Sequence, residues 1–110
     1  MDTVKLRIQT DFNKLRKEIK NIDPELKSEL DEIQDSLDEV SADSEKKRLN
    51  KPLNKLHRFL VDLSDSNSDY NKLITGTENG IEYAQTLGRT YNKFAQWLAM
   101  PQVPDLFLGK

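Results

Sequence analysis

His57 is the only histidine in this chain, and histidine is the side chain that most often serves as a catalytic base or a metal ligand. It lies beside Leu56 and Leu60 in an apolar stripe, which favours a structural histidine at the core boundary over a catalyst. Dinuclear metal sites in helical bundles use inward-facing glutamates and Glu-x-x-His motifs, and the residue three before His57 is Asn54. There is no cysteine. We therefore expect no catalytic residue, no metal site and no cofactor, and a protein that is not an enzyme.

A glycine-bounded segment, Gly76-Thr77-Glu78-Asn79-Gly80, precedes the last helical pattern of the chain. A phosphate-binding loop would add a lysine and a preceding strand, and neither is found here. The segment is therefore interpreted as the end of one helical turn and the start of the next helix.

Basic side chains gather in residues 1–22, with a balance of +3, and in residues 46–63, with a balance of +5. The densest run is Lys46-Lys47-Arg48. Nucleic-acid binders usually add a basic overall charge or interleaved aromatic residues, whereas this chain has a net charge of −2. Nucleic acid is therefore an unlikely partner, and a regulator that binds it through the basic face at 46–51 is kept as an alternative.

Four segments of the chain place apolar side chains three and four positions apart, which is helical spacing. The expected helices span about 3–20, 24–40, the stretch ending near 64, and 78–100. Their stripes are Ile8, Phe12, Leu15 and Ile19; Leu26, Leu30, Ile33, Leu37 and Val40; Leu49, Leu53, Leu56, Leu60 and Leu63; and Ile81, Ala84, Gly88, Tyr91, Ala95 and Leu98. The pattern predicts an all-α fold, an antiparallel up-down-up-down four-helix bundle over residues 1–100 with an extended tail at 101–110.

Local signals mark the helix ends. Asp23, Pro24 and Glu25 are typical of a helix start. Pro52 predicts either a kink in the third helix or a regular helix that starts near residue 50, and the kink is favoured because the stripe keeps its register. Residues 70–74 predict one short helical turn.

The second helix is acidic, since residues 23–45 carry a balance of −9. Its position between two basic helices would favour one pairing order over its rivals. The alternative is a solvated acidic face with no pairing role. No stretch approaches the roughly 20 apolar residues that span a membrane, so we expect a cytoplasmic protein that does not contact a membrane.

The fourth helix is apolar over an arc of roughly 200°, wider than one bundle seam needs. The tail beyond it is also apolar and is kept extended by two prolines. One interpretation is that the tail and the short turn at 70–74 fold over this face. The other is that face and tail bind a partner, through Tyr83, Leu87, Phe94, Trp97, Val103, Leu106 and Phe107.

Residues 81–104 also show a resemblance, carried by the string YNKFAQWLAMPQVP at 91–104. This segment resembles the helical C-terminal segments of large bacterial multidomain proteins that join a nucleotide-binding (NTPase) or leucine-rich signalling or defence core to effector modules. The resemblance covers about a quarter of the chain and includes no catalytic residue. It implies a recognition or assembly module of a larger bacterial protein.

The function expected from the sequence is a non-catalytic protein–protein interaction or assembly domain. Its partner would be another protein, other domains of the same protein, or a second copy of the chain. Two rival hypotheses remain open at this point: the nucleic-acid-binding regulator, and a small-ligand sensor with a pocket between the last helix and the tail.

Overall fold

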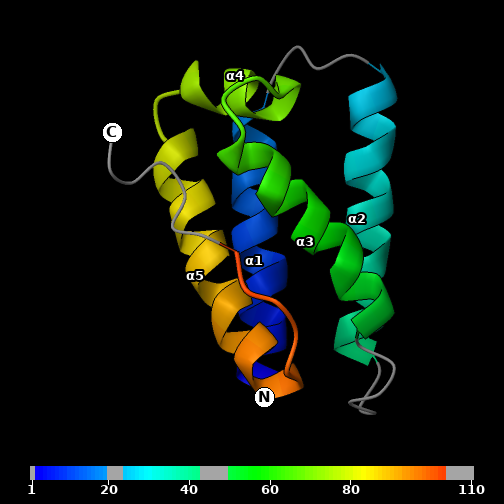
Figure 1. Cartoon of the computed structure of the whole chain (residues 1–110). Coiled ribbons are helices and arrows are strands. Elements are labelled where there is room, and N and C mark those ends of the chain that lie inside the picture. The colour runs from blue at the N-terminus through cyan, green and yellow to red at the C-terminus, as the bar shows by residue number, and fades with distance from the viewer. Residues whose placement is uncertain (1, 20–23, 43–49, 104–110) are drawn as a thin grey trace.

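The computed structural model describes residues 2–19, 24–42 and 50–103. Within these residues the chain is all-helical and contains no strand, which confirms the predicted α class. The helices in chain order are α1 (Asp2–Glu18), α2 (Pro24–Ala42), α3 (Asn50–Ser64), α4 (Asp69–Thr75) and α5 (Gly80–Leu98) (Figure 1).

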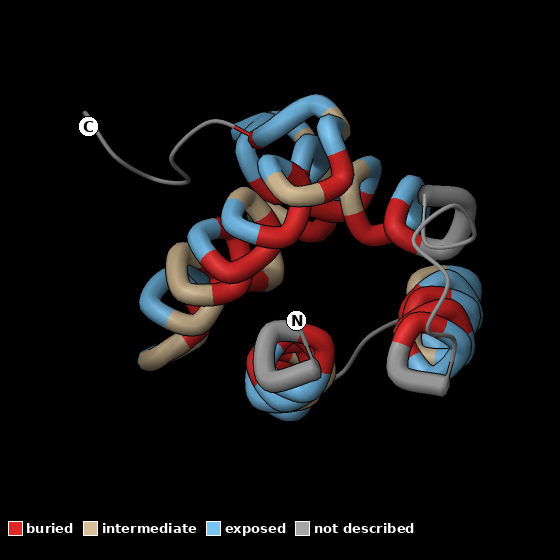
Figure 2. Tube along the Cα trace, turned by 90° about the horizontal axis from the view of Figure 1, so that it is seen from below, coloured by how far each residue is buried: buried red, intermediate tan, exposed pale blue. Residues whose placement is uncertain are grey.

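The long helices pack around a common interior. Helix α1 lies against α2 and α5, while α3 lies against α2, α4 and α5. Figure 2 shows that the buried sides of these helices turn toward one another. The short α4 covers the end of the molecule where α3 stops and α5 begins (Figure 1). The acidic α2 therefore contacts both basic helices, α1 and α3, in the order that the charge pattern predicts.

The predicted stripes form most of the core. Every stripe residue of α1 is buried, as are those of α2 except the half-buried Leu26, and those of α3 from Leu53 onward. Leu49 lies outside the described residues. Ile81 was wrongly placed in the core, because 37% of it is exposed. Ile81 lies nine residues before Thr90, which corresponds to two and a half helical turns. Because Thr90 faces α1, Ile81 projects from the opposite side of α5.

Phe59, which the predicted stripes did not include, contacts aromatic rings of two other helices. Phe59 of α3 is 2% exposed. Its ring meets Phe12 of α1 edge-on, with centroids 5.7 Å apart, and Tyr70 of α4 edge-on at 4.9 Å. Edge-to-face pairs of this kind add stabilisation to that of burial alone. Phe59 therefore fixes α4 against the end of the core.

Side-chain hydroxyls define the ends of α4 and the start of α5. Ser68 accepts a hydrogen bond from the Asn71 amide at 3.1 Å and begins α4. Thr77 Oγ1 accepts from the Gly80 amide and donates to the Ile74 carbonyl, both at 2.9 Å. A Cβ on Gly80 would come within 2.1 Å of that hydroxyl oxygen, so only glycine fits. The segment 76–80 thus separates two helices, as interpreted from the sequence.

Several expectations fall outside the described residues. These are the cap at Asp23 and the tail beyond residue 103. Helix α2 continues to Ala42, two residues past its expected end. Pro52 is the third residue of α3, where a proline fits because first-turn amides have no acceptor within their helix. The expected kink concerns the residues before Asn50, which are not described. Across the described residues, no helix has the length and apolar character needed to cross a membrane.

Candidate functional site

The structure separates the predicted partner-binding residues into two groups. Leu87 and Phe94 are fully buried and Val103 is 5% exposed, so these three belong to the chain's own core. They would reach a partner only if that core opened, which corrects their assignment to an exposed surface. Tyr83 and Trp97 are half-buried and keep part of their surface in solvent. Leu106 and Phe107 lie outside the described residues.

The broad apolar arc of α5 is explained by the number of its neighbours. Helix α5 packs against α1, α3 and α4, and residues 101–103 return over it (Figure 1). A helix in one bundle seam needs a narrower arc. Phe94 and Trp97 meet edge-on, with ring centroids 5.7 Å apart.

The tail is held by two polar side chains of α5. The Asn92 side chain donates from Nδ2 to the Val103 carbonyl at 3.0 Å and accepts the Val103 amide at Oδ1 at 2.8 Å. The Tyr91 hydroxyl donates to the Pro101 carbonyl at 3.4 Å. Residues 101–103 therefore pack on α5 where the sequence suggested a ligand pocket between helix and tail.

The turn between α5 and the tail is a Schellman motif. The Met100 amide donates to the Ala95 carbonyl at 2.8 Å, and the Ala99 amide donates to the Gln96 carbonyl at 3.2 Å. Ala99 has φ 57°, in the left-handed region that usually carries glycine. This turn reverses the chain and directs Val103 back onto the core.

The contact between α1 and α5 contains a buried polar pair. Thr90 Oγ1 donates to Asp11 Oδ2 at 2.8 Å, and the two residues are 6% and 7% exposed. A cavity of about 150 Å³ lies beside this pair and is lined by Asp11, Lys14, Glu82, Tyr83 and Thr86. The hydrogen bond fixes which faces of the two helices meet.

Residues one or two helical turns from Asp11 on α1, or from Thr90 on α5, lie on the same helix face as that residue. On α1 these are Arg7 and Lys14, both exposed, and on α5 they are the half-buried Tyr83 and Trp97 and the exposed Lys93. We call the strip that these five residues border the α1–α5 seam. It combines cations with aromatic surface.

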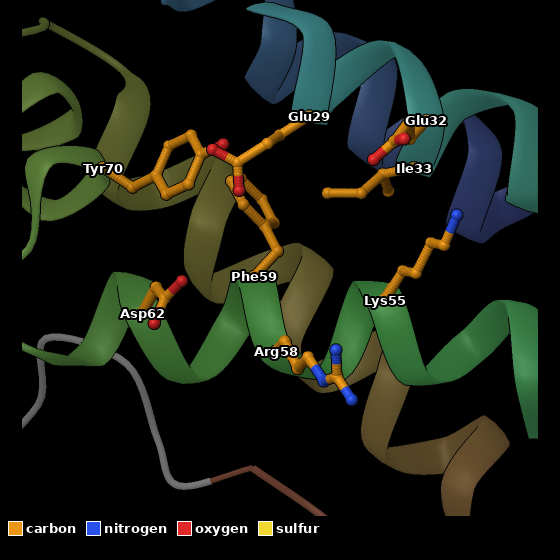
Figure 3. A pocket seen from close by; sticks show the side chains of 8 residues that line it. All are labelled: Glu29, Glu32, Ile33, Lys55, Arg58, Phe59, Asp62 and Tyr70. Carbon is orange, nitrogen blue, oxygen red and sulfur yellow. The ribbon is translucent and has the colours of Figure 1, made fainter. Parts of the chain in front are cut away.

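A second cavity, of about 170 Å³, lies between α2, α3 and α4 (Figure 3). Its inner wall is formed by Ile33, Phe59 and Tyr70, which are buried. Its rim consists of exposed charged residues, namely Glu29 and Glu32 of α2 and Lys55, Arg58 and Asp62 of α3. We call this the α2–α3 cavity. Sequence reasoning missed it because its residues come from three helices.

Figure 3 shows how the charged groups of this cavity are arranged. The Glu29 carboxylate lies beside the rings of Phe59 and Tyr70, while the Asp62 carboxylate stays close to α3 at the same end of the cavity. Lys55 lies at the other end, and the Arg58 guanidinium points away from the aromatic rings. Lys55 of α3 and the acidic side chains of α2 therefore face the same space, whereas Arg58 is directed away from it.

His57 is half-buried, and its ring lies 5.9 Å from that of Tyr91, between centroids. Burial raises the pKa of the Tyr91 phenol to about 12. In the described part of the chain, no cluster of three or more His, Cys, Asp or Glu side chains is arranged to hold a metal ion. His57 thus occupies the core boundary expected from its sequence position.

Comparisons with protein-family models, with characterised proteins and with solved structures found no match to this chain. The resemblance of residues 81–104 therefore stays a sequence-based prediction. The two surfaces described above are the basis for assigning a function.

Proposed function

We propose that this chain is a non-catalytic protein–protein interaction or assembly domain that binds its partner along the α1–α5 seam. The observation that carries the proposal is the half-exposed state of Tyr83 and Trp97, in a helix whose other large apolar side chains are mostly buried. Tryptophan and tyrosine are enriched among the residues that dominate binding energy at protein interfaces. The partly exposed rings of Tyr83 and Trp97 are therefore suited to binding another protein.

The spacing of the seam residues suits a helical partner. Tyr83 and Trp97 are fourteen residues apart in α5, which corresponds to about 21 Å at 1.5 Å per residue. Exposed Arg7, Lys14 and Lys93 lie between or beside them. A partner helix of about four turns, with apolar side chains near its ends and acidic side chains between, would match both features.

The same proposal includes the wider setting. The chain would be a module of a larger bacterial signalling or defence protein, as the resemblance of residues 81–104 implies. It would act in the cytoplasm. Its architecture would be an antiparallel four-helix bundle of α1, α2, α3 and α5. The packing of each of these helices against two of the others supports that architecture.

Charge on α3 favours a protein partner over nucleic acid. Lys55 and Arg58 line the same cavity as three carboxylates. Nearby carboxylates reduce the positive potential that phosphate contacts need. At this cavity the described basic side chains of α3 are therefore accompanied by carboxylates and do not form a purely cationic face.

Affinity capture with matched variants tests this function. The immobilised chain is compared with Tyr83→Ala/Trp97→Ala and with Val61→Ala, which changes an exposed apolar residue of α3. The proposal expects one partner, or a second copy of the chain, to bind the wild type and the Val61 variant. The double variant should lose that binding while keeping its helical circular dichroism.

Binding must then be reproduced with the two purified proteins. Equal binding by folded Tyr83→Ala/Trp97→Ala and wild type would contradict the assignment of the seam as the contact surface. Sedimentation velocity of the chain alone separates a second copy from a different partner.

A further inference from the structure

The Asn79–Gly80 peptide, where α5 begins, has chemistry that the proposed function does not use. Asn79 is the only asparagine of the chain that is followed by glycine. The backbone nitrogen after an asparagine can attack the side-chain amide carbon, and a glycine nitrogen is the most accessible because no Cβ shields it. Packing requires this glycine, since a Cβ on Gly80 would lie 2.1 Å from Thr77 Oγ1 and 2.8 Å from the Ile74 carbonyl oxygen. The fold therefore keeps a reactive dipeptide at the start of α5.

We propose that Asn79 is a self-modification site, which converts to aspartate and isoaspartate under control of the folded start of α5. In the first step the Gly80 nitrogen bonds to Asn79 Cγ, the Cγ–Nδ2 bond breaks, and the Gly80 amide proton leaves with the nitrogen as ammonia. The product is a cyclic succinimide. Solvent water then opens this ring. Cleavage between Cγ and the Gly80 nitrogen gives aspartate, and cleavage between the backbone carbonyl carbon and that nitrogen gives isoaspartate.

The backbone geometry at Asn79 prevents the first step in the folded chain. Ring closure requires the Gly80 nitrogen to rotate toward Asn79 Cβ, because both atoms belong to the five-membered ring. Asn79 has ψ 0°, which places the Gly80 nitrogen over the Asn79 backbone nitrogen instead. Two hydrogen bonds hold this geometry: the Gly80 amide donates to Thr77 Oγ1 at 2.9 Å, and the Tyr83 amide donates to the Asn79 carbonyl at 3.0 Å. Attack therefore requires the helix start to open.

The surroundings of Asn79 supply the other requirements of the reaction. Its side chain is half-buried and forms no capping hydrogen bond at the start of α5. Asn79 also lines a cavity of about 550 Å³ together with Thr77, Glu78 and part of α4. This volume is many times the roughly 30 Å³ that one water molecule occupies. The water that opens the ring can therefore reach Asn79.

The two products differ in their effect on α5. Aspartate leaves the backbone unchanged and places a carboxylate at the helix N-terminus, where it is favourable. Isoaspartate lengthens the backbone by one atom, because the chain then runs through Cβ and Cγ. The carbonyl that accepts the Tyr83 amide is thereby displaced. Conversion to isoaspartate therefore disrupts the first turn of α5, which carries Tyr83.

Peptide mapping by mass spectrometry follows conversion in the full chain, which is incubated at mildly alkaline pH either folded or in guanidinium chloride. Exchange of the amide nitrogen for oxygen raises the peptide mass, and electron-transfer fragmentation separates aspartate from isoaspartate. In denaturant, we expect Asn79 to convert faster than Asn92, which is followed by lysine. In the folded chain, Asn79 should convert at least about tenfold more slowly, because only molecules with an opened helix start react.

Thr77→Val tests the control by the fold, because it removes the acceptor of the Gly80 amide. The folded-state rate should rise about fivefold, as the loss of one hydrogen bond predicts, and the rate in denaturant should stay the same. Thr75→Val is the matched control. Its hydroxyl donates to the Lys72 carbonyl within α4, at 3.2 Å, so neither rate should change.

Absence of conversion at Asn79 in the denatured chain would overturn the proposal. Equal rates in the folded and denatured chains would contradict control by the helix start, as would equal acceleration by Thr77→Val and Thr75→Val.

Discussion

The carboxylate of Asp11 and the hydroxyl of Thr90 form a buried hydrogen bond, 2.8 Å long, between residues that lie 79 positions apart in the sequence. This bond sets the register between α1 and α5. It also places Lys14, one turn from Asp11, beside Tyr83 and Thr86 at the adjacent cavity. The geometry of the α1–α5 seam therefore depends on this pair.

Replacing Thr90 with valine should lower the free energy of unfolding by about 1–3 kcal/mol, because Asp11 would keep its burial and lose its donor. Thr86→Val is the matched control. The Thr86 hydroxyl donates an exposed hydrogen bond to the Glu82 carbonyl of its own helix, so the loss should stay within about 0.5 kcal/mol. Urea denaturation measures both variants. Equal losses of unfolding free energy in the two variants would mean that the buried hydrogen bond stabilises the fold no more than the exposed one.

Ala99→Gly should stabilise the fold by about 0.5–1 kcal/mol. Ala99 has a left-handed backbone conformation. This conformation is unfavourable for residues with a Cβ atom but not for glycine. The same change at Ala95, inside α5, should destabilise the fold instead, since helix interiors disfavour glycine. Thermal unfolding of both variants checks the opposite signs. A lower melting temperature for Ala99→Gly would argue against the Schellman turn.

Asn92→Ala should release the tail, because one side chain satisfies both backbone groups of Val103. We expect faster hydrogen exchange at the Val103 amide and a stability loss of about 1–2 kcal/mol. Gln96→Ala changes an exposed residue one turn further along α5 and should alter neither quantity. Unchanged protection of Val103 in Asn92→Ala would show that the tail is held by its apolar contacts alone.

Stability should fall at alkaline pH through Tyr91. Burial raises the pKa of its phenol to about 12, compared with about 10 when unfolded. The folded state therefore keeps a proton that the unfolded state loses, and the free energy of unfolding decreases as pH rises from about 10 to about 12. The total contribution is about 2–3 kcal/mol, fully present below pH 10.

The Tyr91→Phe variant isolates this effect, because it removes the titrating group. Its stability should decline less between pH 10 and 12 than that of the wild type. Denaturation at fixed pH values provides the comparison. Parallel curves for wild type and Tyr91→Phe would contradict the proposed role of the buried phenol.

The helices could be predicted from the sequence because apolar residues recur with helical spacing and the signals at their ends are local. Leu30, Leu56 and Leu60 are buried as their spacing predicts. Phe59 was left out of the predicted stripe although it follows Leu56 by three residues and precedes Leu63 by four. Its contacts with Phe12 of α1 and Tyr70 of α4 could not be predicted, because folding brings these rings to it.

The candidate sites could be predicted only in part. Leu87 and Phe94 were expected at a partner surface because one helix alone does not reveal how many neighbours cover it. Asp11 and Asn92 are polar and have the local sequence pattern of surface residues. Their roles arise from contacts with Thr90 and Val103, which folding brings to them.

The most direct test of the account is photo-crosslinking from the α1–α5 seam in cells that express the protein. A photoreactive phenylalanine analogue replaces Tyr83 in one sample and Val61, exposed on α3, in the other. We predict a discrete crosslinked product, to another protein or to a second copy, from position 83 and none from position 61. Products of equal yield from both positions, or from position 61 alone, would contradict the seam as the binding surface.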